Sequence, residues 1–207
     1  MTDTRLYLIT PSNFKLDEFS ELLTQALEGG DVASVQLRMK YCYDEDIIAA
    51  AKTLMPICHA KNVAFIINDR ADIARKVNAD GVHIGQEDIT YQEARDIVGD
   101  NQIIGVTCKD SKHLSMTAGE QGADYVAFGS FFPTATKITT STAKPEILTW
   151  WQDLFEIPCV AIGGITIDNA DTIVEAGADF IAVCAGVWEY PEGPRAAVRK
   201  FNDVITQ

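Results

Sequence analysis

Three stretches of the sequence repeat one pattern: "NADGVHIG" (78–85), "GADYVAFG" (122–129) and "GADFIAVCAG" (177–186). Each contains a turn, an Ala-Asp pair, a short apolar run and then a glycine. A segment with a helical pattern precedes each copy, such as "DSKHLSMTAGEQ" (110–121). Short apolar runs that alternate with amphipathic segments indicate βα units, whose parallel strands are buried on both faces.

The whole chain contains eight such runs, each followed by a helical pattern. Eight βα units in 207 residues predict an α/β protein, a single-domain (β/α)8 TIM barrel over residues 1–207. An open doubly wound sheet is the alternative, but it usually has a Gly-rich turn after its first strand, and "LYLITPSNF" (6–14) has none. The runs are "RLYLIT" (5–10), "SVQLR" (34–38), "AFIIN" (64–68), "GVHIG" (81–85), "IIGVT" (103–107), "YVAFG" (125–129), "PCVAIGG" (158–164) and "FIAVC" (180–184).

Composition excludes several kinds of partner. The net charge is −13 and no basic block occurs, which argues against nucleic acid or an anionic membrane, since clustered Lys and Arg hold both. The five cysteines are widely spaced without a C-x-x-C pair, so no zinc or redox motif is indicated. No signal peptide or membrane-length apolar run is present, and we expect a cytoplasmic protein. Whether the chain forms a homo-oligomer stays open.

The aspartate of each repeat stands at the entrance of its strand. Chemistry in these barrels occurs at the opposite, carboxyl ends of the strands. Asp80, Asp124 and Asp179 are therefore predicted to be structural, ending a helix and turning the chain.

Two other acids stand near the carboxyl ends of strands. Asp69 comes after the third run and Asp88 after the fourth. Thr90 and Glu93 form a capping box for the helix that follows Asp88, so Asp88 is not needed as a cap. Asp69 or Asn68, by contrast, could cap the helix that begins near Arg70. As a pair on adjacent strands, the two acids can hold one Mg²⁺ and leave coordination sites for phosphate oxygens.

Cations accompany these acids. Arg38 and Lys40 alternate along the second strand and its loop, so we expect both side chains on the same side. Lys137 lies in the loop after the sixth strand. Three cations and a metal suit a diphosphate, although a solvated surface charge is a plausible alternative for Lys40.

Glycines indicate a second anion site. "AIGGITIDNA" (161–170) follows the seventh strand and "VCAGVW" (183–188) the eighth, where barrels often bind phosphate. No protein nucleophile is evident. His83 is more typical of a hydrogen-bonded core histidine, and Cys108 of a small buried residue.

Five motifs, in order, resemble the thiamine phosphate synthase (thiamine-phosphate pyrophosphorylase) family. The likeness extends from about Leu6 to Trp188. The motifs are "VQLRMK" (35–40), "FIINDRADIA" (65–74), "ADGVHIGQED" (79–88), "GADYVAFGSFFPTATK" (122–137) and "CVAIGGITIDNA" (159–170).

The resemblance implies a (β/α)8 transferase that joins a pyrimidinylmethyl diphosphate to a thiazole phosphate and releases diphosphate, with Mg²⁺ as cofactor and only small phosphorylated molecules as partners. It also implies roles for individual residues. These are Gln36, Leu37, Arg38, Met39, Lys40, Asn68, Thr107 and Lys137 for the pyrimidine diphosphate; Thr134, Ala135, Thr136, Gly164, Cys184 and Ala185 for the thiazole phosphate; and Asp69 and Asp88 for the metal.

The chain departs from the family pattern at a few positions, and two alternative functions are weighed beside the synthase. Relatives often carry histidine where Lys109 stands, and many carry serine at the position of Ala185; the segment after Lys137 also differs. A thiazole tautomerase-like paralogue typically lacks the paired carboxylates and relies on a histidine near position 109. A barrel that senses thiamine precursors without catalysis is the alternative from another class.

Overall fold

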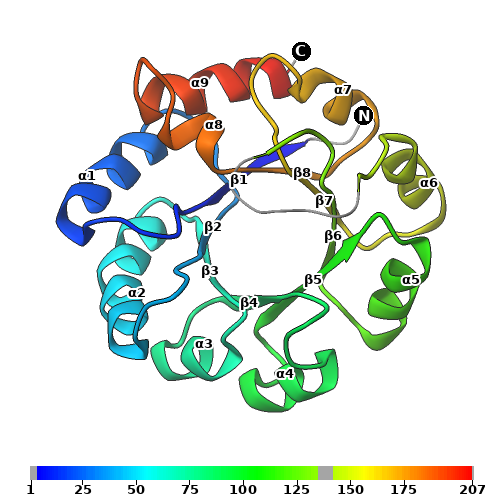
Figure 1. Cartoon of the computed structure of the whole chain (residues 1–207), viewed down its shortest axis with the longest axis horizontal. Coiled ribbons are helices and arrows are strands. Elements are labelled where there is room, and N and C mark those ends of the chain that lie inside the picture. The colour runs from blue at the N-terminus through cyan, green and yellow to red at the C-terminus, as the bar shows by residue number, and fades with distance from the viewer. Residues whose placement is uncertain (1–3, 135–141, 207) are drawn as a thin grey trace.

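The eight apolar runs form a closed parallel barrel. A computed structural model describes residues 4–134 and 142–206, and its strands pair in chain order from β1 to β8, with β8 returning to β1 (Figure 1). The predicted (β/α)8 fold is confirmed. The strands are β1 Arg5–Ile9, β2 Ser34–Leu37, β3 Ala64–Asn68, β4 Gly81–Ile84, β5 Ile103–Lys109, β6 Tyr125–Phe128, β7 Cys159–Ile162 and β8 Phe180–Val183.

Helices surround the barrel on its outside (Figure 1). A short helix, α8, follows β8 directly, and α9 then packs against α1 and closes the ring. Within the described ranges, no helix combines the length and the apolar character that a membrane crossing requires. The helices are α1 Leu16–Leu27, α2 Asp44–His59, α3 Ala71–Val77, α4 Tyr91–Val98, α5 Lys112–Gln121, α6 Glu146–Leu154, α7 Ala170–Glu175, α8 Ala185–Trp188 and α9 Pro194–Ile205.

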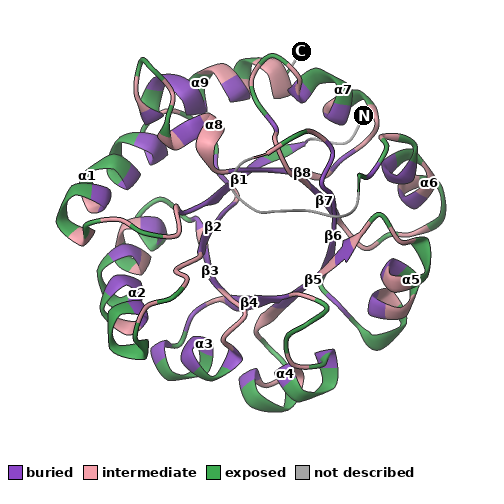
Figure 2. Cartoon of the chain, in the orientation of Figure 1, coloured by how far each residue is buried: buried purple, intermediate pink, exposed green. Residues whose placement is uncertain are grey.

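Apolar residues fill two regions, one on each face of the sheet. The larger region lies between the strands and the inner faces of the helices, where buried and exposed faces are clearly separated (Figure 2). The smaller one lies inside the barrel and includes Tyr7, Tyr125 and Val160. Burial on both faces explains why the strands are continuously apolar rather than alternating.

The three repeated aspartates tie neighbouring strands together. The N–H of Asp80 donates to the carbonyl of Phe65 on the preceding strand, and its carboxylate accepts the N–H of the same residue at 2.6 Å. Asp124 pairs in this way with Ile104, and Asp179 with Cys159. Each pair of bonds fixes the entrance of one strand against the next, as a structural role requires.

The predicted detail of that role was wrong. The turn is made two residues before each aspartate, at positions with left-handed φ: Asn78 (55°), Gly122 (97°) and Gly177 (94°). Glycine and asparagine adopt this conformation most readily. The aspartates therefore neither end the helix nor turn the chain. Each forms two hydrogen bonds to the strand that precedes its own strand in the barrel.

Candidate active site

Neither predicted metal-binding acid caps a helix. Thr90 and Glu93 form the predicted capping box at the start of α4. The residue before α3 is Arg70, and no side chain caps that helix. Asp69 has a left-handed φ of 63°, and its N–H donates to the carbonyl of His83 on β4 at 2.8 Å. A strained backbone held by the neighbouring strand is a common feature of functional positions.

The two carboxylates lie next to each other at the strand ends. Asp69 forms an ion pair with the ammonium of Lys40, and Asp88 accepts the N–H of Gly85 at 2.7 Å. Loss of hydration and the adjacent Asp69 carboxylate raise the pKa of Asp88, while the Gly85 N–H and Lys40 oppose that shift. The mutual repulsion of two close carboxylates is the kind of cost that a bound cation removes.

The donor set fits a hard divalent cation such as Mg²⁺. Two carboxylates supply oxygen ligands, and among residues 4–134 and 142–206 no group of three or more His, Cys, Asp or Glu side chains is placed to hold an ion. An ion at Asp69 and Asp88 would therefore complete its coordination with water or phosphate oxygens, as Mg²⁺ usually does.

Arg38 and Lys40 contact opposite neighbours of β2. The guanidinium of Arg38 donates to the hydroxyl of Ser12 at 2.6 Å, and the backbone N–H of Arg38 donates to the hydroxyl of Thr10 at 2.9 Å. The backbone N–H of Lys40 also donates to Ser12, but the side chain of Lys40 contacts Asp69. β2 ends at Leu37, so both side chains extend from the segment that follows the strand, and their placement on the same side stays a prediction.

The other residues predicted for the pyrimidine diphosphate differ in their positions. Gln36 is buried inside the barrel, whereas Leu37 is buried in the outer core and Met39 packs partly against it. Asn68 ends β3 opposite His83. The hydroxyl of Thr107 is hydrogen-bonded to His83. Leu37 can thus contribute to a site at the mouth only through its backbone.

Gly164 shapes the region predicted for the thiazole phosphate. Its φ is 66°, and a Cβ there would lie 2.4 Å from the carbonyl oxygen of Pro133. The missing side chain lets the segment that leads to Thr134 pass directly over the end of β7. Ala135, Thr136 and Lys137 lie outside the described residues.

Cys184 and Ala185 begin the short helix α8. The thiol of Cys184 lies 3.7 Å from the carbonyl oxygen of Thr10, which directly follows β1. Burial raises the pKa of this thiol to about 11, against the nearby positive charge of Arg38. The predicted pyrimidine diphosphate and thiazole phosphate sites therefore adjoin at Arg38 and Cys184. Cys108 is fully buried, as predicted, and burial raises its pKa to about 12.

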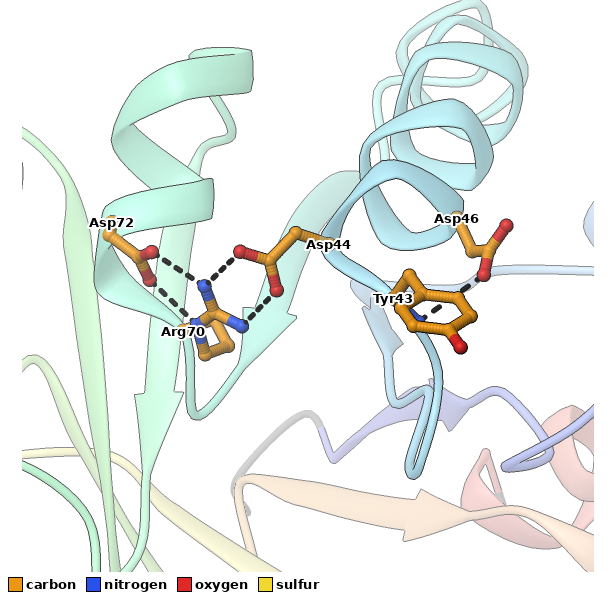
Figure 3. A network of polar contacts seen from close by, with 5 residues as sticks. All are labelled: Tyr43, Asp44, Asp46, Arg70 and Asp72. Carbon is orange, nitrogen blue, oxygen red and sulfur yellow. Dashed lines mark hydrogen bonds and ion pairs between the residues drawn. The ribbon is translucent and has the colours of Figure 1, made fainter.

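The roles of several residues near the mouth were not predicted from the sequence. Thr10 and Ser12 hold Arg38; their position directly after the first strand could have identified them. Arg70 makes paired hydrogen bonds to Asp44 and to Asp72, and so links the starts of α2 and α3 (Figure 3). This link is non-local, so no sequence pattern indicated it.

A closed (β/α)8 barrel with paired carboxylates, two cations and a glycine-shaped turn at its strand ends has the architecture of a barrel enzyme, whose active site lies at that face. The model of a family described as thiamine monophosphate synthase matches residues 6–187, and the chain belongs to this family. Its members are transferases of thiamine biosynthesis.

Named relatives agree with this assignment. Thiamine-phosphate synthase of Rhodospirillum centenum is 60% identical, with 99% of each chain covered. The enzyme of the same name from Hyphomonas neptunium is 49% identical over 96% of this chain and 92% of its own. The solved structure of thiamine phosphate pyrophosphorylase from Pyrococcus furiosus superposes with a TM-score of 0.87 at 34% identity, covering 99% of this chain and 96% of that one.

Proposed function

We propose that this chain condenses hydroxymethylpyrimidine diphosphate with thiazole phosphate in a Mg²⁺-dependent reaction that forms thiamine phosphate and releases diphosphate. The proposed Mg²⁺ dependence rests on one observation: Asp69 and Asp88 are adjacent carboxylates at the mouth, beside the ammonium of Lys40. Full-length similarity to named thiamine-phosphate synthases supports the reaction itself.

The reaction needs charge neutralisation rather than a nucleophile on the protein. The bond between the methylene carbon and the diphosphate oxygen breaks, and the oxygen keeps the electron pair. The electron-rich aminopyrimidine stabilises the positive charge that develops on the carbon, and the thiazole nitrogen then forms the new C–N bond. No proton has to be transferred, so a site without an activated Ser, Cys or His is chemically sufficient.

The residues at the mouth have separate tasks in this proposal. Asp69 and Asp88 would hold Mg²⁺, which when bound neutralises charge on the departing diphosphate. Arg38 and Lys40 add positive charge from the two sides of β2, where their contacts hold them. Lys137 is proposed to bind the diphosphate as well.

The thiazole phosphate is assigned to the ends of β6, β7 and β8. Gly164 brings the segment at Thr134 close to β7, and Ala135 and Thr136 are proposed to continue this site. At Cys184 and Ala185, backbone N–H groups at the start of α8 can approach a phosphate without a side-chain hydroxyl.

Two alternative functions are less well supported. A thiazole tautomerase-like reaction relies on a histidine near position 109, where this chain has lysine, and does not need the paired carboxylates. A precursor sensor would not need a metal beside the diphosphate.

One experiment separates the three. The protein is mixed with both phosphorylated substrates and Mg²⁺, and released diphosphate and thiamine phosphate are measured together with the same reactions in EDTA. Release of both products, abolished by EDTA and restored by excess Mg²⁺, is expected. Binding of the substrates without diphosphate release would instead indicate a sensor. Conversion of a thiazole precursor without the pyrimidine substrate would indicate a tautomerase.

A further inference from the structure

Side chains from five strands form a continuous line of hydrogen bonds inside the barrel. The amide of Gln36 lies 2.9 Å from the hydroxyl of Tyr7, which lies 2.9 Å from the hydroxyl of Tyr125. Tyr125 is 2.9 Å from Nδ1 of His83, and Nε2 of His83 is 2.7 Å from the hydroxyl of Thr107. This line, here called the interior chain, connects two residues predicted for the pyrimidine diphosphate site.

Four of the five members of the interior chain are shielded from water, and Thr107 is half-buried. Gln36, Tyr7, Tyr125 and His83 are each less than a tenth exposed. Burial raises the pKa of Tyr7 to about 12, and that of Tyr125 well above its usual value. Both hydroxyls therefore keep their protons at neutral pH. Each can accept one hydrogen bond and donate another, so the direction of donation on one side of a hydroxyl fixes the direction on its other side.

Gly105 makes the connection between Tyr125 and His83 possible. It lies on β5, where it is the register partner of His83 on β4 and of Tyr125 on β6. A Cβ at Gly105 would lie 1.9 Å from Cζ of Tyr125. The bare backbone lets the tyrosine ring lie across β5 and stack on the imidazole, with ring centroids 5.5 Å apart.

With one proton on each hydroxyl and one on the His83 ring, the interior chain has two consistent directions. In the first, the Gln36 amide donates to Tyr7, the donation continues through Tyr125 to Nδ1 of His83, and Nε2–H donates to Thr107. The Gln36 carbonyl oxygen then remains as an acceptor and the Thr107 hydroxyl as a donor. In the reverse direction, Gln36 offers only N–H groups and Thr107 gives its proton to His83.

Only the first direction matches an aminopyrimidine diphosphate at both ends. The exocyclic amine requires an acceptor, which the Gln36 carbonyl supplies. The diphosphate oxygens require a donor, which the Thr107 hydroxyl supplies. A pyrimidine with an oxo group in place of the amine requires a donor from Gln36, and this reverses the interior chain and removes the donor at Thr107.

We propose that Tyr7, Tyr125 and His83 are positioning residues, which couple the hydrogen-bond direction of Gln36 to that of Thr107 and so make amine recognition and diphosphate recognition depend on each other. The inference rests on the proposed function for the substrate class. It adds a source of selectivity for the amine that lies in the barrel interior, away from the substrate.

Tyr125→Phe tests the coupling, because it removes one hydroxyl link and keeps the ring. Tyr91→Phe is the matched control: Tyr91 is also buried, and its hydroxyl donates to the carbonyl of Gly122 at 2.7 Å, outside the barrel interior. Calorimetry with Mg²⁺ and without thiazole phosphate measures the affinities for the aminopyrimidine diphosphate and its oxo analogue. Melting temperatures of both variants are measured alongside.

The expected result is a loss of selectivity rather than of binding in general. In Tyr125→Phe, the ratio of the two affinities should fall by about tenfold, while Tyr91→Phe keeps the wild-type ratio. A purely structural defect would weaken the binding of both ligands equally and leave the ratio of their affinities unchanged. An unchanged ratio in a folded Tyr125→Phe protein would overturn the proposal.

A second variant keeps the test decisive if Tyr125→Phe does not fold. Tyr7→Phe removes the hydroxyl that Gln36 contacts, and should lower the same ratio. The double variant should lose little more selectivity than either single one, because one break already uncouples the ends; full additivity would count against the coupling.

The proposed function is tested separately by product formation in the wild-type protein. No product from both substrates and Mg²⁺ would overturn the function and this inference together. Product formation combined with an unchanged ratio in the variants would overturn the inference alone.

Discussion

The ammonium of Lys40, which follows β2, forms an ion pair with the carboxylate of Asp69, which follows β3. This contact places a positive charge where the proposed Mg²⁺ would bind. Lys40 therefore has two opposite effects. It competes with the metal for Asp69 in the free protein, and it adds to charge neutralisation once a diphosphate is present.

Lys40→Gln should consequently separate metal binding from turnover. Removing the competing cation is expected to tighten Mg²⁺ binding to the free protein by about threefold, since partly exposed ion pairs contribute modestly. Turnover should fall, because the departing diphosphate loses one counter-charge. Calorimetry of Mg²⁺ and the rate of diphosphate release measure the two effects. Lys15→Gln, which removes an exposed pair with Glu18 on α1, is the control and should change neither quantity. Weaker Mg²⁺ binding in Lys40→Gln would contradict this account of the pair.

Asp88→Ala tests the metal assignment directly. Loss of a metal ligand removes several kcal/mol of charge stabilisation, so turnover should fall by about a thousandfold or more. The melting temperature should change little, because Asp88 caps no helix. The hydrogen bond that its carboxylate accepts from the N–H of Gly85, three residues away, is exposed and local. Glu87→Ala, at an exposed acid one position away, should keep wild-type turnover. Near-normal turnover in Asp88→Ala would rule out Asp88 as a metal ligand.

Gly164→Ala should affect one substrate only. The new methyl group would meet the carbonyl oxygen of Pro133 at 2.4 Å and push away the segment that leads to Thr134. We expect a raised KM for thiazole phosphate and an unchanged KM for the pyrimidine diphosphate. Gly193→Ala is a suitable control, because Gly193 also has a positive φ (85°), but a Cβ added there would meet no atom within 4 Å. Both variants should therefore lose about 1–3 kcal/mol of stability from backbone strain, and only Gly164→Ala should show the kinetic change.

The barrel could be predicted from the sequence because its signal is local. Each strand is an apolar run of four to seven residues with a turn before it, and the eight runs correspond to the eight strands. The dismissal of Asp88 as a helix cap rested on Thr90 and Glu93, which are neighbours in the sequence. Contacts between such sequence neighbours can therefore be predicted from the sequence alone.

The site was less predictable because its contacts are non-local. Tyr7 and Tyr125 are 118 residues apart in the sequence, yet their hydroxyls meet inside the barrel. The different partners of Arg38 and Lys40 depend on which side chains follow β1 and β3. These positions come from closure of the barrel, which no local pattern describes.

The three repeated aspartates, Asp80, Asp124 and Asp179, should contribute to stability and not to catalysis. In Asp179→Ala, the buried N–H of Cys159 loses its carboxylate partner, and Gln152 loses a hydrogen bond of 2.6 Å. A buried donor without a partner should lower the free energy of unfolding by about 1–3 kcal/mol. Urea denaturation measures this, with Asp203→Ala on the exposed side of α9 as the control. The folded Asp179→Ala protein should retain wild-type kcat; a kinetic defect without loss of stability would show that the repeated aspartates have another role.

The Arg70 network should make stability depend on pH in the acid range. Hydrogen bonds from Arg70 lower the pKa of Asp44 and of Asp72 below the ordinary value of 3.8 (Figure 3). Because the pKa values are lower in the folded state, the stabilisation is fully present above the unfolded pKa and is lost as the pH falls through the folded one.

Arg70→Gln should therefore be less stable than the wild type at about pH 7, and the difference should shrink as the pH falls below 3.8 through the lower folded pKa values of Asp44 and Asp72. Urea denaturation at several pH values measures the two curves. Arg75→Gln removes an exposed cation from the same helix, and its difference from the wild type should stay nearly constant with pH. If the Arg70→Gln difference did not shrink in acid, Arg70 would stabilise α2 and α3 by packing, and not through the two carboxylates.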